Sequence, residues 1–448
     1  MILALVLTAG IQLPQTPVPV PALPVQTGQQ TQGLASIRGF LSKQEVIRVF
    51  ISPAPGNGHQ AASATVIKRL RELGYKGSIE AVYQDSVKRK LPYLLPGFRE
   101  DGPDSQALDG GITALSFSRF TASPPQRLEV GISGADEDFL PRHLPELGVH
   151  HLLQLQPMNW SFGQAIITQE EQTRVASLDH LSRLGYVYDI PKRADPRAFL
   201  ARQLPGSAKL QGLNAVFDTA GRHELMPVYG VGLQNGTAKL GSLLRAVSLA
   251  RPSRGVVVPV FSDIEAGSLK RMPGVEVLPV TDPSVEKRLQ DLRPGEILVL
   301  LTGTVPQDVF EFIYSQATLP AVVAGLNARN LMRLLGLPYF RTVFNDERKG
   351  LVGFFGEEAL KTPQDPAMLL VAAANKEVAS ASESLENAAR FIAESMRASS
   401  PVRRLFDTLG RMGRTLADDK LAQGLLALIG VARESQAAHR ELVPERGG

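Results

Sequence analysis

The pattern of apolar and polar positions between residues 45 and 85 predicts a strand, a helix and a second strand. The segments EVIRVFIS and GSIEAVYQ have the composition of β-strands. Between them, AASATVIKRLRELGY places its apolar residues on one stripe of a helix and its charged residues on the other side; the stripe is Ala62, Val66, Ile67, Leu70 and Leu73. This order of elements indicates a parallel sheet with a right-handed crossover.

Further apolar segments continue the α/β pattern in two halves. Strands are expected at 111–120, 127–134 and 149–157, and residues 194–222 are then interrupted by Pro and Gly. The pattern restarts with strands expected at 226–232, 255–262, 275–281, 296–303 and 320–325. From about residue 365 the chain is mostly helical in pattern.

These patterns predict an α/β protein with two domains, each with strand-loop-helix order. A chain of 448 residues is too long for one ordinary core. The expected parts are a disordered Pro/Gln-rich leader at 1–40, an N-terminal domain at 41–210, a C-terminal domain at 211–365 and a helical tail at 366–448 that packs on the domains or extends them.

Composition excludes several classes of function. The net charge of +4 is small for this length and argues against a dedicated nucleic-acid-binding protein. The chain has no cysteine, which excludes disulfides, thiolate catalysis and cysteine-ligated zinc. The leader has no charge before Arg38 and a short apolar run, so it lacks the features of a signal peptide or a spanning helix. We expect a cytoplasmic protein, or one exported by an unconventional route as a bacterial effector is.

The segment Gly56-Asn57-Gly58-His59 lies where the first strand ends and the helix begins. Glycines let the backbone approach a ligand there, and the N-terminus of a helix favours an anion. The segment lacks the Lys-Ser/Thr of a phosphate-binding loop and the spacing of a dinucleotide-binding loop. Two interpretations stay open: a plain turn that caps the helix, and a binding loop in which His59 acts as a general base.

The segment PAPGNGHQAASATVIKRLRELGY resembles the first glycine loop of GT-B glycosyltransferases. The resemblance is to the branch that contains the peptidoglycan N-acetylglucosaminyltransferase and the galactolipid synthases. It implies an acceptor-side loop made by Gly56, Asn57 and Gly58, with Asn57 in place of a glycine. His59 stands at the position of the loop histidine of that family.

The second half resembles a GT-B donor domain, and the resemblance of both halves implies an α/β fold with two Rossmann-like domains that face each other across a cleft. PVYGVGLQNGTAKLGSLLRAV and the region from LTGTVPQ to GLPYF carry the resemblance. It implies a set of donor-binding residues: Gly230, Gly232, Gln234, Asn235, Gly236, Thr302, Gly303, Thr304, Gln307, Gly325, Asn327 and Asn330. Many members of the family hold the donor ribose with a glutamate where this chain has Asn330 or Leu331. The ribose contact therefore differs here, or the donor differs, or activity is lost.

The resemblance implies a glycosyltransferase that transfers a hexosyl or hexosaminyl group to an acceptor hydroxyl without a metal or another cofactor. A UDP-sugar is the favoured donor. Backbone amides and a helix dipole would stabilise the leaving diphosphate. His59 is the first candidate for the base, and the acidic run Asp136, Glu137 and Asp138 is the second. This run equally suits the first turn of a helix.

The acceptor is a protein, a lipid or a glycan, and nucleic acid is not an expected partner. The segment SVKRKLPYLLPGF at 86–98 suits a peripheral membrane contact, or a solvated face beside a buried one. Two other functions stay open: a nucleotide-sugar epimerase with the same two domains, and a catalytically inactive GT-B-like binding or effector protein. Donor turnover without acceptor would identify the first, and failure to bind any sugar nucleotide would support the second.

Overall fold

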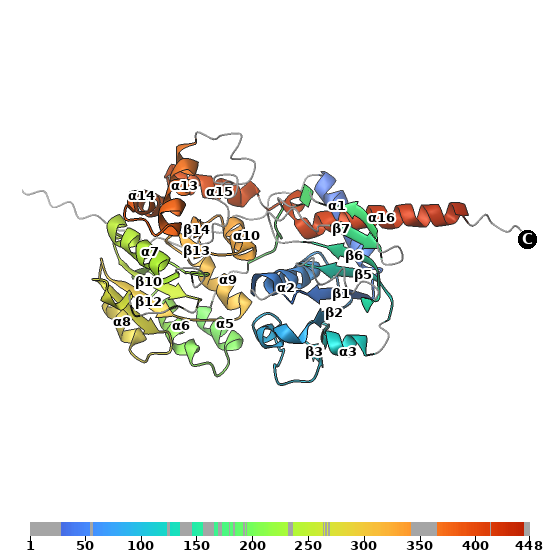
Figure 1. Cartoon of the computed structure of the whole chain (residues 1–448), viewed down its shortest axis with the longest axis horizontal. Helices are drawn as coiled ribbons and strands as arrows, with labels where there is room; N and C mark the ends of the chain where they lie inside the picture. The colour runs from blue at the N-terminus through green and yellow to red at the C-terminus, as the bar shows by residue number, and fades with distance from the viewer. Residues whose placement is uncertain are drawn as a thin grey trace, which may run out of the picture.

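The protein is described by a computed structural model that forms two lobes lying side by side (Figure 1). The described residues are 28–53, 57–122, 126–134, 146–155, 165–168, 173–178, 180–181, 184–190, 193, 195–231, 236–262, 264, 267, 269–341, 365–412 and 414–442.

The described strands of the first domain form one sheet in the order β3-β4-β2-β1-β5-β6-β7-β8. Their bounds are β1 (Val46–Ile51), β2 (Ser78–Tyr83), β3 (Ser105–Leu108), β4 (Ile112–Ser116), β5 (Leu128–Ser133), β6 (Val149–Gln154), β7 (Ala165–Thr168) and β8 (Thr173–Ser177). The central strands β4, β2, β1, β5 and β6 are parallel, and β3, β7 and β8 add antiparallel pairs at the edges. Helix α2 (Asn57–Glu72) joins β1 to β2, as its apolar stripe predicts.

The second domain is also built on parallel strands. Its described strands pair in the orders β11-β12-β10-β9 and β13-β14, and Val228 bridges to both Val260 and Val322, which connects the two groups. The bounds are β9 (His223–Leu225), β10 (Gly255–Val260), β11 (Val275–Pro279), β12 (Ile297–Leu301), β13 (Ala321–Val323) and β14 (Tyr339–Arg341). The α/β fold class with two Rossmann-like domains is thereby confirmed.

Helices cover both sheets. Besides α2 they are α1 (Gly28–Leu41), α3 (Phe117–Thr121), α5 (Pro196–Gln203), α6 (Lys209–Asp218), α7 (Gly236–Ala250), α8 (Val285–Asp291), α9 (Gln307–Ser315), α10 (Leu326–Leu335), α13 (Pro366–Ala379), α14 (Glu386–Ser395), α15 (Pro401–Met412) and α16 (Lys420–Leu442). Short 3-10 helices lie at η1 (Asp85–Tyr93), η4 (Leu269–Arg271) and η6 (Leu416–Asp418). Among the described helices, none has the length and apolarity that crossing a membrane requires.

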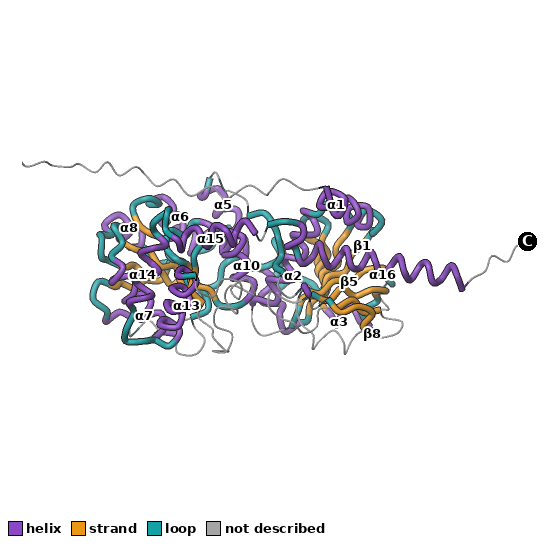
Figure 2. Tube along the Cα trace, turned by 90° about the horizontal axis from the view of Figure 1, so that it is seen from above, coloured by secondary structure: helices purple, strands orange, loops and turns teal. Residues whose placement is uncertain are grey.

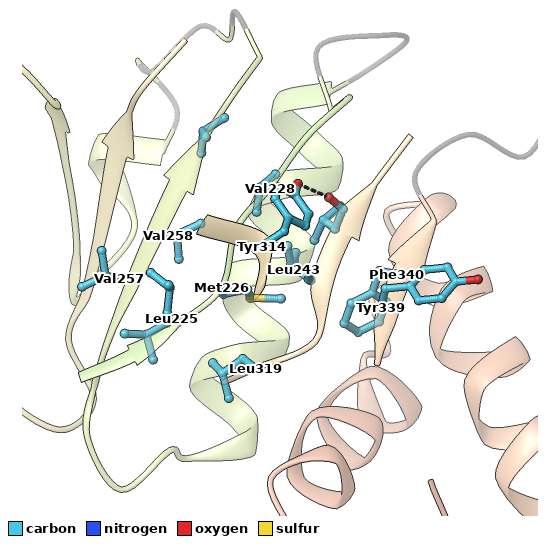
Figure 3. Close-up of a cluster of buried hydrophobic side chains, with 14 of the residues drawn as sticks. Leu225, Met226, Val228, Leu243, Val257, Val258, Tyr314, Leu319, Tyr339 and Phe340 are labelled. Atoms are coloured by element: carbon cyan, nitrogen blue, oxygen red, sulfur yellow. Dashed lines mark hydrogen bonds between the residues drawn. The ribbon is translucent and has the colours of Figure 1, made fainter. Parts of the chain in front are cut away.

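Each domain has its own apolar core. Figure 3 shows part of the core of the second domain, where Leu225, Val257 and Leu319 pack around the sheet. Tyr314 is fully buried in this core. Its hydroxyl donates to the carbonyl of Val322 at 2.8 Å, so the polar group of the side chain is satisfied. The expected boundary at residue 210 falls within α6, whose Leu213 and Val216 belong to this second core together with residues of α5.

The helical tail is divided between the two domains. Helices α13, α14 and α15 lie with the second domain, and α16 returns to the first, where it extends beyond that domain (Figures 1 and 2). Leu421, Leu425 and Leu428 of α16 are fully buried in the first core. The tail therefore packs on both domains and carries the chain back across the interface.

One expectation about the leader is corrected. Residues 28–40 were expected to be disordered with the rest of 1–40, but Gly28–Leu41 forms helix α1. Ile37 and Leu41 of α1 are buried in the first core, where α1 packs beside α16. The composition of α1 is a weak indicator because the apolar partner that stabilises this helix comes from the opposite end of the chain. Residues 1–27 lie outside the described residues.

His223 makes the stability of the second domain depend on pH. It begins β9 and is 4 % exposed, and burial, with the nearby charge of Arg254, lowers its pKa to about 4. The unfolded chain binds this proton with a pKa near 6.5. The neutral imidazole therefore stabilises the fold above that pH, and this contribution, about 3 kcal/mol in all, is lost as the pH falls toward 4.

We expect His223→Gln to remove this part of the pH dependence of stability. The measurement is the urea midpoint near neutral pH and again near pH 4, compared between wild type and variant. His180→Gln, at an exposed position, is the control and should retain the wild-type slope. An unchanged slope in His223→Gln would contradict the assignment.

Candidate functional site

The first half of the candidate site lies at the carboxyl end of β1, where α2 begins. Gln60 Nε2 donates to the carbonyl of Ser52 at 2.7 Å, and Ser63 Oγ donates to the carbonyl of Phe50 at 3.0 Å. These two bonds tie the first turns of α2 to the end of β1. The N-terminus of α2 is therefore held at the edge of the sheet where ligands bind in parallel α/β domains.

This edge is also a topological switch point of the sheet. β1 pairs with β2 on one side and with β5 on the other, so the chain leaves β1 in one direction and β5 approaches from the other. Gly134, directly after β5, lies so close to α2 that a Cβ there would be 2.9 Å from the backbone of Ser63. Tyr186 Oη donates to the carbonyl of Gly134 at 3.1 Å and fixes this approach.

His59 is the third residue of α2 and is half-buried at this edge. Asn57 is the first residue of the helix, and Gly58 has open space where a Cβ would lie. Gly56, Asp136 and Glu137 lie outside the described residues. Of the predicted candidates for the general base, His59 is therefore the one that lies within the described residues.

Sequence analysis missed a row of buried polar side chains at this edge. The central strands each end on one, or are followed by one: Ser52 after β1, Tyr83 in β2, Ser116 in β4, Ser133 in β5 and Gln154 in β6, all at most 2 % exposed. The register places Tyr83 opposite Ser116, and Ser133 opposite Gln154. A polar residue at the carboxyl end of successive apolar segments was the signal that could have revealed them.

The second half of the candidate site lies where the second sheet reverses its strand order. Gly230, with φ of +82°, approaches Ala324 so closely that an added Cβ would lie 1.9 Å from Ala324 Cβ. Its N–H donates to Ser262 Oγ at 2.7 Å. Gly325 follows Ala324 with φ of +83° and precedes the first residue of α10. Two of the predicted donor-side glycines therefore lie next to each other at the N-terminus of α10.

The remaining residues of the loop between Gly230 and α7 are described only in part. Gly236 is the buried first residue of α7, and a Cβ there would lie 1.4 Å from the carbonyl oxygen of Val231. Gly232, Gln234 and Asn235 lie outside the described residues. Gly236 is therefore required for the chain to turn back into α7.

Three predicted donor-binding residues, Thr302, Gly303 and Thr304, form the loop that follows β12. Thr302 is buried, and its N–H donates to the carbonyl of Val260 at 2.9 Å. Gly303 has φ of +62°, and the carbonyl of Thr304 accepts from Lys209 Nζ at 2.6 Å. The loop is thus fixed by bonds to β10 and α6 and leads directly into α9.

Asn327 and Asn330 of α10 differ in their surroundings. Asn327 is half-buried, whereas Asn330 is 3 % exposed and donates from Nδ2 to the carbonyl of Tyr186 at 2.9 Å. A Cβ on Gly185 would lie 1.8 Å from Asn330 Oδ1. The amide of Asn330 therefore joins the second domain to the segment that leaves the first.

Helix α2 contacts α9 and α10, so the two domains meet at this interface. Lys68 Nζ pairs with Glu311 Oε2 at 3.0 Å, and Gln307 Nε2 donates to Thr65 Oγ1 at 3.2 Å and to Glu311 Oε1 at 2.8 Å. α2 lies beside α9 in Figure 1 and beside α10 in Figure 2. Of the four polar residues in these contacts, Gln307 was predicted and Thr65, Lys68 and Glu311 were not.

Glu311 is the buried charge at the centre of this interface, with its side chain 4 % exposed. Lys68 also lies 4.8 Å from the ring centre of Tyr188, and burial together with Glu311 raises the pKa of Tyr188 well above its usual value. A buried carboxylate needs such partners to compensate its lost hydration. Polar side chains with defined partners therefore make this contact between the two domains.

Arg329 of α10 is a buried positive charge. It is 3 % exposed, and burial, with smaller contributions from Arg341 and Arg333, lowers its pKa to about 10. Burial likewise lowers the pKa of Arg341 at the end of β14. Arg333 lies in the last turn of α10, so of these three arginines Arg329 is the one in the N-terminal half of the helix, whose dipole favours an anion. In the part of the chain that is described, no group of three or more His, Cys, Asp or Glu side chains is placed to hold a metal ion.

No protein-family model matches the chain, and no curated protein matches it. Several solved structures resemble it, among them the following three. An α,α-trehalose-6-phosphate synthase from Burkholderia multivorans aligns with a TM-score of 0.35 and 11% identity, over 87% of this chain and 99% of that one. An α,α-trehalose-phosphate synthase (UDP-forming) from Burkholderia vietnamiensis aligns with a TM-score of 0.37 and 11% identity, over 88% and 96%. A putative UDP-N-acetylglucosamine 2-epimerase from Listeria monocytogenes aligns with a TM-score of 0.33 and 10% identity, over 79% and 95%. At these TM-scores nothing about the activity of this chain follows from the likeness.

Proposed function

We propose that the chain is a metal-independent glycosyltransferase of the GT-B type. It would move a hexosyl or hexosaminyl group from a nucleotide sugar, with a UDP-sugar as the first candidate, to a hydroxyl of an acceptor. The observation that carries the proposal is that a helix N-terminus lies at the switch point of each of the two parallel sheets. One is α2 with His59, the other is α10 beside Gly230 and Gly325, and the two helices contact each other.

The donor would bind to the second domain. The backbone N–H groups that follow Gly325, the dipole of α10 and the charge of Arg329 suit a diphosphate. Gln307 Oε1 is buried and has no hydrogen-bond partner among the described residues, while Nε2 of the same amide is bonded twice. This oxygen is available to accept a hydrogen bond from an N–H group of the base.

The donor ribose would be held by a group other than Asn330. The Asn330 amide already donates to the carbonyl of Tyr186. This bond explains why a carboxylate is absent at that position. A glutamate there would lose this hydrogen bond and bring an uncompensated charge into a buried site.

His59 would act as the general base on the acceptor side. The acceptor oxygen forms a bond to the anomeric carbon as the bond from that carbon to the diphosphate oxygen breaks. The hydroxyl proton passes to the imidazole, and the diphosphate leaves toward α10, where positive charge stabilises it. Asp136 and Glu137 are the second candidates for the base.

The test is a thermal-shift screen of the protein against UDP, GDP, dTDP, CMP and their sugars. At a ligand concentration of about ten times Kd, one nucleotide should stabilise the fold by about 1.4 kcal/mol. Radiolabelled donor then serves to find the acceptor. His59→Ala should lower the rate of transfer by about 100-fold or more and leave the donor-induced shift unchanged.

His180→Ala, at an exposed position, is the control and should retain transfer. Full transfer activity in His59→Ala would remove the histidine from the mechanism. Donor turnover without an acceptor would identify an epimerase. A screen in which no nucleotide shifts the melting temperature would reject the transferase in favour of an inactive binding protein.

A further inference from the structure

Tyr83 is a buried hydroxyl whose hydrogen-bonding capacity is not used. It is the last residue of β2, at the same sheet edge as the N-terminus of α2, and is 1 % exposed. Its Oη has no hydrogen-bond partner among the residues that the structure describes. Its ring packs edge-on against Phe98, with centroids 5.5 Å apart. Buried hydroxyls are nearly always paired, so this one indicates a partner that binds from outside.

The groups around Tyr83 form a polar cluster that reaches the surface. Ser118 Oγ donates to Asp85 Oδ2 at 3.3 Å, and Ser116 Oγ lies 3.1 Å from Ser118 Oγ. Asp85 and Ser118 are exposed, whereas Tyr83 is buried. Ser116 lies opposite Tyr83 in the sheet, and its N–H donates to the carbonyl of Asp104 at 2.8 Å. Burial, followed by the charges of Asp104 and Asp85, raises the pKa of Tyr83 to about 12, so its hydroxyl stays protonated at neutral pH.

The cluster contains a carboxylate that is already neutralised. Asp104 Oδ1 pairs with Lys88 Nζ at 3.1 Å, and the same Nζ donates to the carbonyl of Gly102 at 3.2 Å. One carboxylate, Asp85, is then left to carry net charge beside three hydroxyl groups, those of Tyr83, Ser116 and Ser118. A divalent cation prefers several charged oxygen ligands. A neutral ligand rich in hydroxyl groups suits this set better.

We propose that the cluster of Tyr83, Asp85, Asp104, Ser116 and Ser118 binds the hydroxyl groups of a carbohydrate, which is the acceptor of the proposed transfer. The assignment rests on the proposed function and names the class of its acceptor. Carboxylates accept hydrogen bonds from sugar hydroxyls, and the tyrosine hydroxyl can donate to one or accept from one. β2 is the neighbour of β1, about 4.8 Å away, so a sugar held here lies beside the strand that leads to His59.

The experiment is saturation-transfer-difference NMR on the full-length protein with the methyl glycosides of glucose, galactose, mannose and N-acetylglucosamine. At least one glycoside should bind the wild type. Tyr83→Phe and Asp85→Asn should each weaken its binding by about three- to tenfold, because each removes one hydrogen bond to the ligand. Tyr93→Phe is the matched control, since Tyr93 is 40 % exposed in the adjacent η1, and its binding should equal that of wild type.

A loss of stability should not be mistaken for a loss of binding in this test. Removal of a hydroxyl that has no partner in the protein should leave the melting temperature of Tyr83→Phe unchanged or raise it. Binding that is equal in wild type, Tyr83→Phe and Asp85→Asn would overturn the subsite. So would the absence of binding by every glycoside, or binding of Mn²⁺ to the cluster that Asp85→Asn abolishes. The donor screen is independent. A nucleotide shift without glycoside binding rejects this subsite alone, whereas glycoside binding without a nucleotide shift rejects the transferase, and with it the acceptor role, and leaves a carbohydrate-binding site.

Discussion

Gly230→Ala is expected to lower the free energy of unfolding by about 3–4 kcal/mol and to abolish nucleotide binding. A residue with a side chain loses about 1–2 kcal/mol at the φ of +82° that Gly230 adopts. The added methyl carbon would also lie 1.9 Å from Ala324 Cβ, so the two segments must separate, which costs about another 2 kcal/mol. That separation displaces the N-terminus of α10, where the donor diphosphate is proposed to bind. The measurements are the midpoint of thermal unfolding and the nucleotide-induced shift.

Gly295→Ala separates the two contributions to this loss. Gly295 has a φ of +85° in the same domain, but no heavy atom lies within 4 Å of where its Cβ would be. We expect it to cost about 1–2 kcal/mol through backbone strain and to leave nucleotide binding intact. Equal losses of stability in the two variants would contradict the close contact between Gly230 and Ala324.

Asp419→Ala is expected to lower the free energy of unfolding by about 3–5 kcal/mol. The Asp419 carboxylate is fully buried, and burial raises its pKa, an effect that Arg69 partly offsets. It accepts from Arg69 Nε at 2.6 Å and from the backbone N–H groups of Val187 and Leu421 at 3.4 Å and 3.2 Å. Its removal leaves the largely buried guanidinium of Arg69 without its closest counter-charge, which is among the more costly single changes. Urea unfolding followed by circular dichroism measures the loss.

An exposed Arg–Asp pair provides the matched control for this variant. Asp218 pairs with Arg197 at the surface, where the Arg197 side chain is 68% exposed. Asp218→Ala should therefore cost about 0–1 kcal/mol. The double variant Arg69→Met/Asp419→Leu should recover part of the loss of Asp419→Ala, since it removes both buried charges. A double variant that is no more stable than Asp419→Ala would show that the ion pair is not the cause.

The position of Asp419 explains why its effect extends beyond one contact. Gly185 and Asp419 bridge as parallel strands, and the N–H of Lys420 donates to the carbonyl of Gly185 at 2.8 Å. These two segments carry the chain from the first domain to the second and back. Asp419 and Arg69 therefore tie both crossings to α2. Asp419→Ala should loosen the relation between the domains as well as lower stability.

Much of the local structure could be predicted from the pattern of residues. The period of the apolar residues in α2, and the short β-branched segments that became β1, β2, β10 and β12, specify their own conformations because each pattern buries one face of one element. Gly325 was predicted at a strand–helix junction and has a positive φ there, whereas Gly230 was placed within an expected strand and also has a positive φ. Asn57, Gly58 and His59 were predicted in a loop before the helix, but the helix begins at Asn57 and includes all three. The roles of these residues in binding and catalysis stay predictions.

The contacts that join distant segments could not be predicted in this way. Lys68 and Glu311 are 243 residues apart, and Arg69 and Asp419 are 350 residues apart, so no spacing rule relates them. α1 forms although its segment has few apolar residues, because α16 covers it. Asn330 was predicted to contact the nucleotide-sugar donor. Only the fold brings its amide to the carbonyl of Tyr186.

The chain alone thus determines its class, its main helices and strands, and the positions where glycine permits a turn at a strand end, because these follow from local backbone preference and from burial of one face. The tertiary structure decides which strand ends become neighbours, which charges are buried together and which hydroxyls are left for a ligand. Those outcomes depend on strand order and on the return of α16 to the first domain, which bring together residues that the sequence holds far apart.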